Sequence, residues 1–89
     1  MGLLLKVEER FQIRGRGVVL EPGLPVEFGA PQRLSVRLVR PDGTERTTQA
    51  VVEYALASGP NLTRREWCAL VLPGLTKEDV PIGTEVFVV

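Results

Sequence analysis

The residues of this chain whose types could do chemistry are few. Glu8 and Glu9 form an adjacent carboxylate pair, but neighbouring residues of a strand point to opposite faces and cannot flank one reacting atom. Cys68 is the only cysteine and the chain has no histidine, so a catalytic thiol lacks its usual base. For the same reason a thiolate or imidazole metal site lacks its ligands. We therefore predict that the protein is not an enzyme and holds no metal or cofactor.

The segment Gly15-Arg16-Gly17 has the glycine spacing of a phosphate-binding loop but not the rest of the motif. A third glycine, a Lys-Ser/Thr pair and a following helix are all missing, so neither the dinucleotide motif nor the P-loop is present. The sequence instead favours a bulge or bend in a strand. We expect this chain alone to bind no GTP.

The balance of charged residues does not predict a surface that binds polyanions. Eleven basic residues, nine of them arginine, balance eleven acidic residues, so the formal net charge is zero. No global field therefore draws nucleic acid or a membrane toward the chain. The arginines fall into groups along the sequence, and an RNA-binding interpretation requires these groups to converge in space. Only five aromatic residues accompany them, which is few for a platform that stacks bases.

Composition also indicates the compartment. A single cysteine allows no internal disulfide, so nothing points to an oxidising environment. The apolar run Leu3-Leu4-Leu5 is too short for the core of a signal sequence, and no run approaches the ~18–20 residues of a membrane span. We expect a cytoplasmic protein without membrane contact.

The elements that would position these residues are short strands. Sixteen glycines and prolines punctuate the chain, and alternating apolar runs lie between them, which is typical of an all-β domain. Leu3, Leu5 and Val7 alternate as in a half-buried strand, and Phe11 and Ile13 resume that alternation. Three further strands are predicted, each with an apolar set on one face: Leu34, Val36 and Leu38; Ala50, Val52 and Tyr54, which we expect to face inward; and Cys68, Leu70 and Leu72.

The connections between the strands are predicted from turn residues. The predicted connections are turns at Glu21-Pro22-Gly23 and Pro41-Asp42-Gly43, a short strand at Val26 and Phe28, a loop from Ala57 to Arg65, and a single helical turn over residues 77–79 capped by Thr76. Strands of this kind must close or nearly close to hide their edges. The sequence therefore predicts a single β-barrel domain over residues 1–89, with six or seven antiparallel strands.

Two segments resemble parts of a known barrel. From Leu70 to Val86 the sequence LVLPGLTKEDVPIGTEV passes from an apolar strand through a glycine turn and an acidic helical turn to a closing strand. This segment resembles the end of the second-domain β-barrel of translation GTPases such as elongation factor Tu. The segment FQIRGRGVV, from Phe11 to Val19, resembles the start of the same barrel. The resemblance covers residues 8–89, matches only in strand rhythm over residues 21–50, and implies a barrel of the elongation factor Tu domain 2 type that occurs without its GTPase domain.

The resemblance also implies a binding surface. In the family this barrel helps to hold the aminoacylated 3′ end of tRNA, partly through an acidic pair and a phenylalanine, and Glu8, Glu9 and Phe11 stand at those positions. Trp67 replaces a polar residue of that pocket. We therefore predict a non-catalytic binding module for a protein or ribonucleoprotein partner, and the resemblance implies translation as its process. The predicted contact residues are Glu8, Glu9, Phe11, Arg14, Arg16 and Trp67.

Two alternatives remain open from the sequence. The first is a module that binds RNA or a tRNA end directly, which the arginines would serve if they converged. The second is a homo-oligomer that pairs through an open strand edge.

Overall fold

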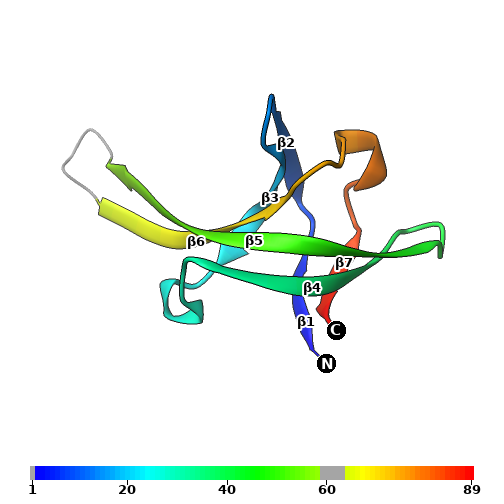
Figure 1. The fold of residues 1–89 in the computed structure, drawn as a ribbon, viewed down its shortest axis with the longest axis horizontal. Coiled ribbons are helices and arrows are strands. Elements are labelled where there is room, and N and C mark those ends of the chain that lie inside the picture. The colour runs from blue at the N-terminus through cyan, green and yellow to red at the C-terminus, as the bar shows by residue number, and fades with distance from the viewer. Residues whose placement is uncertain (1, 59–63) are drawn as a thin grey trace.

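The computed structural model describes residues 2–58 and 64–89, which form one antiparallel sheet of seven strands (Figure 1). Along the sheet the order is β1-β7-β4-β5-β6-β3-β2. The strands are β1 (Leu3–Lys6), β2 (Glu9–Ile13), β3 (Gly17–Leu24), β4 (Gln32–Val39), β5 (Glu45–Ser58), β6 (Arg64–Leu72) and β7 (Glu85–Val88). The predicted all-β, antiparallel class is therefore confirmed.

One stretch of chain supplies both edges of this sheet. β1 pairs with β7, and after a bend the same stretch continues as β2, which pairs with β3. At the bend Val7 N donates to Thr84 O and Glu8 N donates to Glu21 O, each at 2.8 Å. The two edge strands thus lie consecutively along the chain, but in the described residues the sheet is not closed by hydrogen bonds between them.

The core contains most of the three apolar sets that were predicted to share a face. Its buried side chains include Val36, Leu38, Ala50, Val52, Cys68, Leu70 and Leu72, and Leu34 packs against them. Burial of each large apolar side chain contributes about 1.5–3 kcal/mol, so the period-two pattern of these strands accounts for much of the driving force for folding.

Tyr54 is 50% exposed and not buried as predicted. β5 pairs with β4 only as far as Val52, and β6 pairs with β3 only from Cys68 onward. Beyond these points β5 and β6 pair only with each other, as a two-stranded arm (residues 53–58 and 64–67) that projects from the sheet in Figure 1. Tyr54 keeps the inward side of its strand, but the core does not extend to it.

The arm also corrects the predicted loop from Ala57 to Arg65. β5 continues to Ser58 and β6 already begins at Arg64, so both ends of that segment are strand. The rest of the predicted loop, residues 59–63, lies outside the described residues.

Two glycine segments differ from their predicted structures: one predicted as a bulge or bend lies at a turn, and one predicted as a turn lies inside a strand. Gly15-Arg16-Gly17, predicted as a bulge or bend, lies at the tight turn of the β2–β3 hairpin, where Arg16 N donates to Ile13 O at 3.0 Å and Gly17 begins β3. Glu21-Pro22-Gly23, predicted as a turn, lies inside β3, where the pairing with β6 shifts register. Positive φ angles occur in both segments, at Gly15 and at Gly23, and such angles suit turns and bulges alike.

Two one-turn 3-10 helices connect strands. η1 (Val26–Phe28) replaces the predicted short strand, because Phe28 N folds back to donate to Pro25 O at 2.9 Å. η2 (Lys77–Asp79) confirms the helical turn predicted after Thr76. No helix in the described part of the chain is long and apolar enough to cross a membrane.

Asp79 should make the fold sensitive to acid. The hydrogen bond from Thr76 N, at 2.9 Å, is the main cause that holds the pKa of Asp79 below its ordinary value, and nearby Arg46 lowers it further. Because this pKa is lower in the folded chain than in the unfolded chain, the stabilisation is present above the unfolded pKa of about 4 and is lost as the pH falls through the folded value. We expect Asp79→Asn to flatten the fall in the free energy of unfolding below about pH 5, measured by urea denaturation.

The exposed neighbour Glu78 provides the control for this titration. Glu78→Gln removes one carboxylate of the same turn but keeps the bonds to Thr76, so it separates the loss of a charge from the loss of those bonds. If the free energy of unfolding fell with pH equally steeply in the two variants, Asp79 would not contribute to the acid sensitivity.

Candidate functional site

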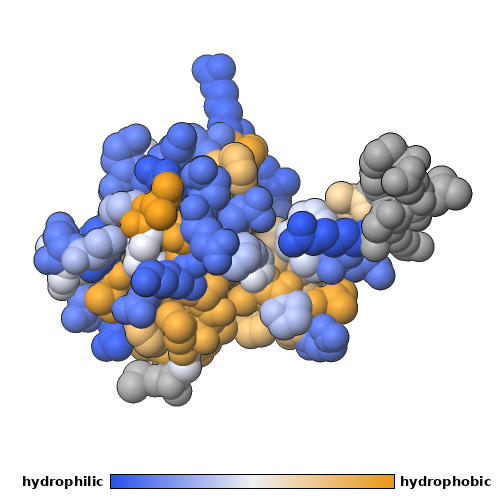
Figure 2. Space-filling model, turned by 180° about the vertical axis from the view of Figure 1, so that it is seen from behind, coloured by the Kyte–Doolittle hydropathy of each residue, from blue (hydrophilic) through white to orange (hydrophobic). Residues whose placement is uncertain are grey.

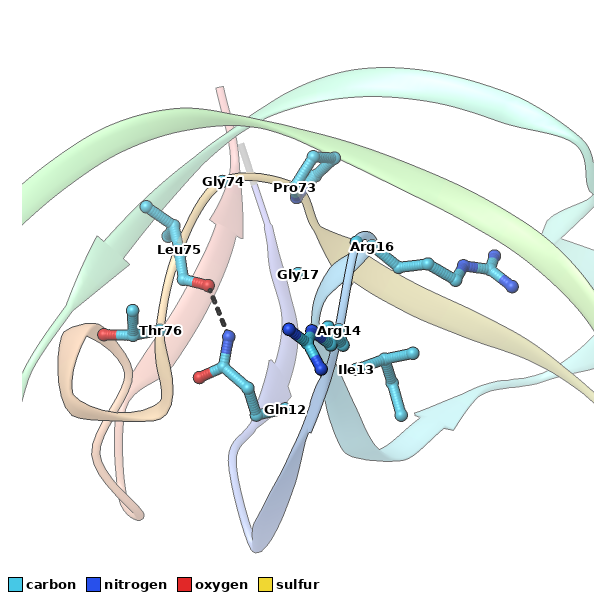
Figure 3. A pocket seen from close by; sticks show the side chains of 10 residues that line it. Gln12, Ile13, Arg14, Arg16, Gly17, Pro73, Gly74, Leu75 and Thr76 are labelled. Carbon is cyan, nitrogen blue, oxygen red and sulfur yellow. Dashed lines mark hydrogen bonds between the residues drawn. The ribbon is translucent and has the colours of Figure 1, made fainter.

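A pocket of about 630 Å³ opens between the β2–β3 turn and the segment that follows β6 (Figure 3). Its lining residues are Gln12, Ile13, Arg14, Gly15, Arg16, Gly17, Pro73, Gly74, Leu75 and Thr76. They come from only two stretches, 12–17 and 73–76, which are distant in sequence. Each stretch lies inside one of the two segments on which the predicted resemblance rests, 11–19 and 70–86, so the fold brings parts of both segments together at one pocket.

Gln12 fixes the two sides of the pocket to each other. Its Nε2 donates to Leu75 O at 3.3 Å, the bond drawn in Figure 3, and its Oε1 accepts from Lys77 N at 2.9 Å. β2 is an edge strand, and both hydrogen bonds come from the connection between β6 and β7. A single amide side chain therefore holds the free side of the hairpin in place and shapes the pocket.

Two arginines and no acidic residue line the pocket. Figure 3 shows the guanidinium of Arg14 on the pocket side of the hairpin, whereas Arg16 turns away toward β5. There Arg16 forms an ion pair with Glu53. In the part of the chain that the structure describes, Arg14 makes no ion pair and no side-chain hydrogen bond. Its planar guanidinium is therefore available to an anionic group, which it can bind with two parallel hydrogen bonds.

An apolar stripe, which we define as Phe11 and Ile13, adjoins the pocket on the outer face of the sheet. These side chains are 48% and 40% exposed. Phe11 lies level with Val19 of β3 and Val71 of β6, in the row of side chains that points away from the core. The alternation predicted for this strand is present, but its apolar side faces solvent. Ile13 belongs to both the stripe and the pocket lining, so the two are continuous.

The other end of the stripe is acidic. Glu9 lies on the same face of β2 and level with Glu21 of β3. A hydrogen bond of 2.9 Å from the Arg10 backbone N–H is the main cause that lowers the pKa of Glu9, and the positive charges of Arg10 and Lys77 lower it further. The surface thus runs from a basic end at the hairpin turn to an acidic end at the bend before β2.

The structure brings some of the six predicted contact residues together and separates others. Phe11 shares its face with Glu9, and Arg14 and Arg16 stand at the turn end of the same hairpin. Glu8 is exposed at the bend that precedes β2. These five residues are strung along one hairpin rather than gathered at one point.

Trp67 lies apart from the other predicted contact residues. It stands on β6, separated from β2 by β3 and four residues along the strand from Val71, which is level with Phe11. Arg65 lies over its ring, with 5.1 Å between the guanidinium carbon and the ring centre. Its indole also packs so closely on Gly23 that a Cβ there would come within 2.6 Å of it. Trp67 thus has structural partners of its own, Arg65 in the arm and Gly23 in β3.

Sequence reasoning missed a second exposed apolar surface, on the arm. Tyr54 and Leu56 of β5 are 50% and 48% exposed, and Val26 of η1 is also exposed. Figure 2, which views the molecule from behind, shows a broad apolar area that continues toward the arm. The alternation of Tyr54 and Leu56 is visible in the sequence, but it does not reveal where the strands that cover β5 stop.

No protein-family model, no curated protein and no solved structure matches this chain. Within the described residues, no group of three or more histidine, cysteine, aspartate or glutamate side chains could hold a metal ion. Cys68 is a buried thiol whose Sγ lies 3.7 Å from Val26 O. The functional conclusion therefore rests on the geometry of the hairpin and its pocket.

Proposed function

We propose that this chain is a non-catalytic binding module that contacts a protein or ribonucleoprotein partner, in translation or its control. The contact surface would be the hairpin surface, defined here as the stripe together with the pocket lined by residues 12–17 and 73–76. In this proposal the sheet is of the type found in the second domain of translation factors.

The observation that carries the proposal is the exposed stripe beside Arg14, which has no partner among residues 2–58 and 64–89. Phe11 and Ile13 are large, exposed apolar side chains on an edge strand, and burying them against a partner would release the water that now covers them. Aromatic and arginine side chains are enriched at the centres of protein interfaces, where they supply most of the binding energy. Phe11 and Arg14 lie three residues apart at the hairpin surface.

The position of the pocket supports the relationship to translation factors. The two resembling segments are separated by some fifty residues in the chain, and residues from both, and from nowhere else, line the pocket. A shared fold does not by itself carry function, so the role in translation is the part of the proposal that depends on resemblance.

Other charges of the sheet favour a protein partner over RNA. Arg16 pairs with Glu53, Arg37 pairs with Glu45 at 3.7 Å, and Arg46 pairs with Asp79 at 3.7 Å. The guanidinium of Arg37 also lies 5.4 Å from the centre of the Phe87 ring. Cations engaged in this way are less available to a phosphate backbone, which needs several of them along its path.

The proposal is tested by affinity capture from the native cell lysate, with tagged protein and with nuclease-treated and untreated halves in parallel. We expect a protein partner that survives nuclease and that is reduced at least about tenfold by the double variant Phe11→Ser, Ile13→Ser, because both side chains lie at the proposed contact. Ile82→Ser is the matched control, since Ile82 is 52% exposed but lies outside the hairpin surface.

Each other outcome points to a different function. Partners that disappear with nuclease would support direct RNA binding instead. Partners that bind the double variant as well as the parent chain would overturn the hairpin surface as the contact. A dimeric mass by light scattering of the purified chain would support self-association, for which the exposed apolar face of the arm is suited.

A further inference from the structure

We propose that the pocket receives a carboxylate of the partner, carried by an acidic and apolar peptide segment whose neighbouring apolar side chains lie on the stripe. The inference rests on the proposed binding function and names the chemistry of the segment that is bound. The carboxylate would meet Arg14, and the adjoining residues would cover Ile13 and then Phe11.

Charge complementarity selects an anionic group for the pocket. Of the two arginines in its lining, Arg16 is already paired with Glu53, whereas Arg14 has no partner in the described part of the chain. No acidic side chain lines the pocket to compete for Arg14. A carboxylate that enters from a partner is therefore the first acid that Arg14 would meet, and the fork of an arginine fits the two oxygens of a carboxylate.

The size and walls of the pocket fit a side chain or chain end better than a lone ion. A volume of about 630 Å³ is within the range of about 300–1,000 Å³ of sites for organic ligands. Its lining includes two exposed apolar residues, Ile13 and Pro73, and one buried apolar residue, Leu75. The ligand that uses all of this surface carries an apolar group next to its negative charge.

The same surface disfavours a chain of phosphates. No aromatic side chain lines the pocket, so a nucleotide base that entered it would find no ring on which to stack. A polyanion that continued along the stripe would next meet Glu9 and Glu21, which lie level with each other at its far end. A peptide has its negative charge at one place and can present neutral or basic residues to these acids.

The test begins with a phage-displayed library of random peptides panned against the whole chain, followed by calorimetric titration of the enriched peptides. We expect the enriched peptides to place an aspartate, a glutamate or a free C-terminus beside apolar residues. Arg14→Gln should weaken their binding about ten- to hundredfold, because it removes a charged hydrogen-bond donor from the contact. Arg14→Lys should recover only part of the loss, since an ammonium lacks the fork.

Arg33→Gln is the matched control. Arg33 is an exposed arginine of β4 outside the pocket, so this variant changes the net charge equally and should bind the peptides like the parent chain. Thermal melts of both variants should match the parent, because both side chains are exposed. An effect of Arg33→Gln equal to that of Arg14→Gln would indicate only a general charge effect and would overturn the inference.

Two further results would overturn the inference while leaving the proposed function standing. One is enrichment of basic or purely apolar peptides; the other is equal binding of the acidic peptides to Arg14→Gln. Tighter binding of an oligouridine probe than of any enriched peptide would replace the peptide with a nucleic acid. The proposed function fails separately, when the stripe variant Phe11→Ser, Ile13→Ser captures the same partners as the parent chain.

Discussion

Gly17→Ala is expected to destabilise the fold by about 3–5 kcal/mol, as the sum of backbone strain and overpacking. Gly17 has φ +119°, a conformation that side chains rarely adopt. A Cβ at this position would collide with Leu72 O and lie only 2.8 Å from Pro73 Cα. Both obstacles are backbone atoms of the strand end that pairs with β3, so neither can move aside without separating β3 from β6.

Such a loss is large for a chain of this size. A domain of 89 residues has a free energy of unfolding of roughly 5–13 kcal/mol, so the substitution would remove a large part of its stability. The measurement is urea denaturation followed by circular dichroism, together with a thermal melt, in which the midpoint should fall by at least about 12 °C.

Gly15→Ala separates strain from collision. Gly15 also has a positive φ, +79°, but an added Cβ there would meet nothing within 4 Å. Its substitution should therefore cost only about 1–2 kcal/mol for the left-handed conformation. Similar losses at the two glycines would mean that β3 and the end of β6 do not approach each other as closely as described.

Leu70→Ala is the second substitution with a large expected effect, about 3–5 kcal/mol. Leu70 is fully buried on β6, level with Leu20 of β3 on one side and with Val52 of β5 on the other. Its strand is held by a ladder on both sides, so the neighbours can collapse only partly into the space that the shorter side chain leaves. The midpoint of urea unfolding should fall while its slope stays unchanged.

Leu56→Ala provides the comparison within the same sheet. Leu56 is the same residue type on the neighbouring strand, but it is nearly half exposed in the arm, so its truncation should cost less than about 1 kcal/mol. A similar loss at Leu56 and Leu70 would contradict the assignment of the arm as a surface outside the core. A small loss of stability from both Leu56→Ala and Leu70→Ala would mean that neither residue lies in the core.

The candidate site was only partly predictable. Phe11, Arg14 and Arg16 were selected from the sequence through a predicted resemblance of two segments to a known barrel, which stays a prediction. The residues of the other side of the pocket, 73–76, could be predicted as a turn but not as its wall. That relation depends on Gln12, whose amide joins the hairpin to Leu75 and Lys77 across more than sixty residues of chain. A contact of this length leaves no local signal in the sequence.

The sequence by itself determined the class of the fold, the core strands and two of the connections. Alternation in β4, β5 and β6 placed Val36, Ala50 and Leu70 inward, because a strand turns successive side chains to opposite faces wherever it lies. Pro41-Asp42-Gly43 and the turn after Thr76 followed from their own backbone preferences. These are local properties, so they can be predicted without knowledge of the rest of the molecule.

Only the tertiary structure decided which alternating faces are covered. Phe11 and Tyr54 belong to regular apolar patterns, yet both remain exposed, because the strands that would cover them end or lie elsewhere. It also decided which glycine segment turns the chain and which bends a strand, since positive φ angles permit both and pairing with β6 fixes the choice. Local conformation depends on neighbouring residues of the chain, whereas burial depends on the partners that the whole sheet brings together.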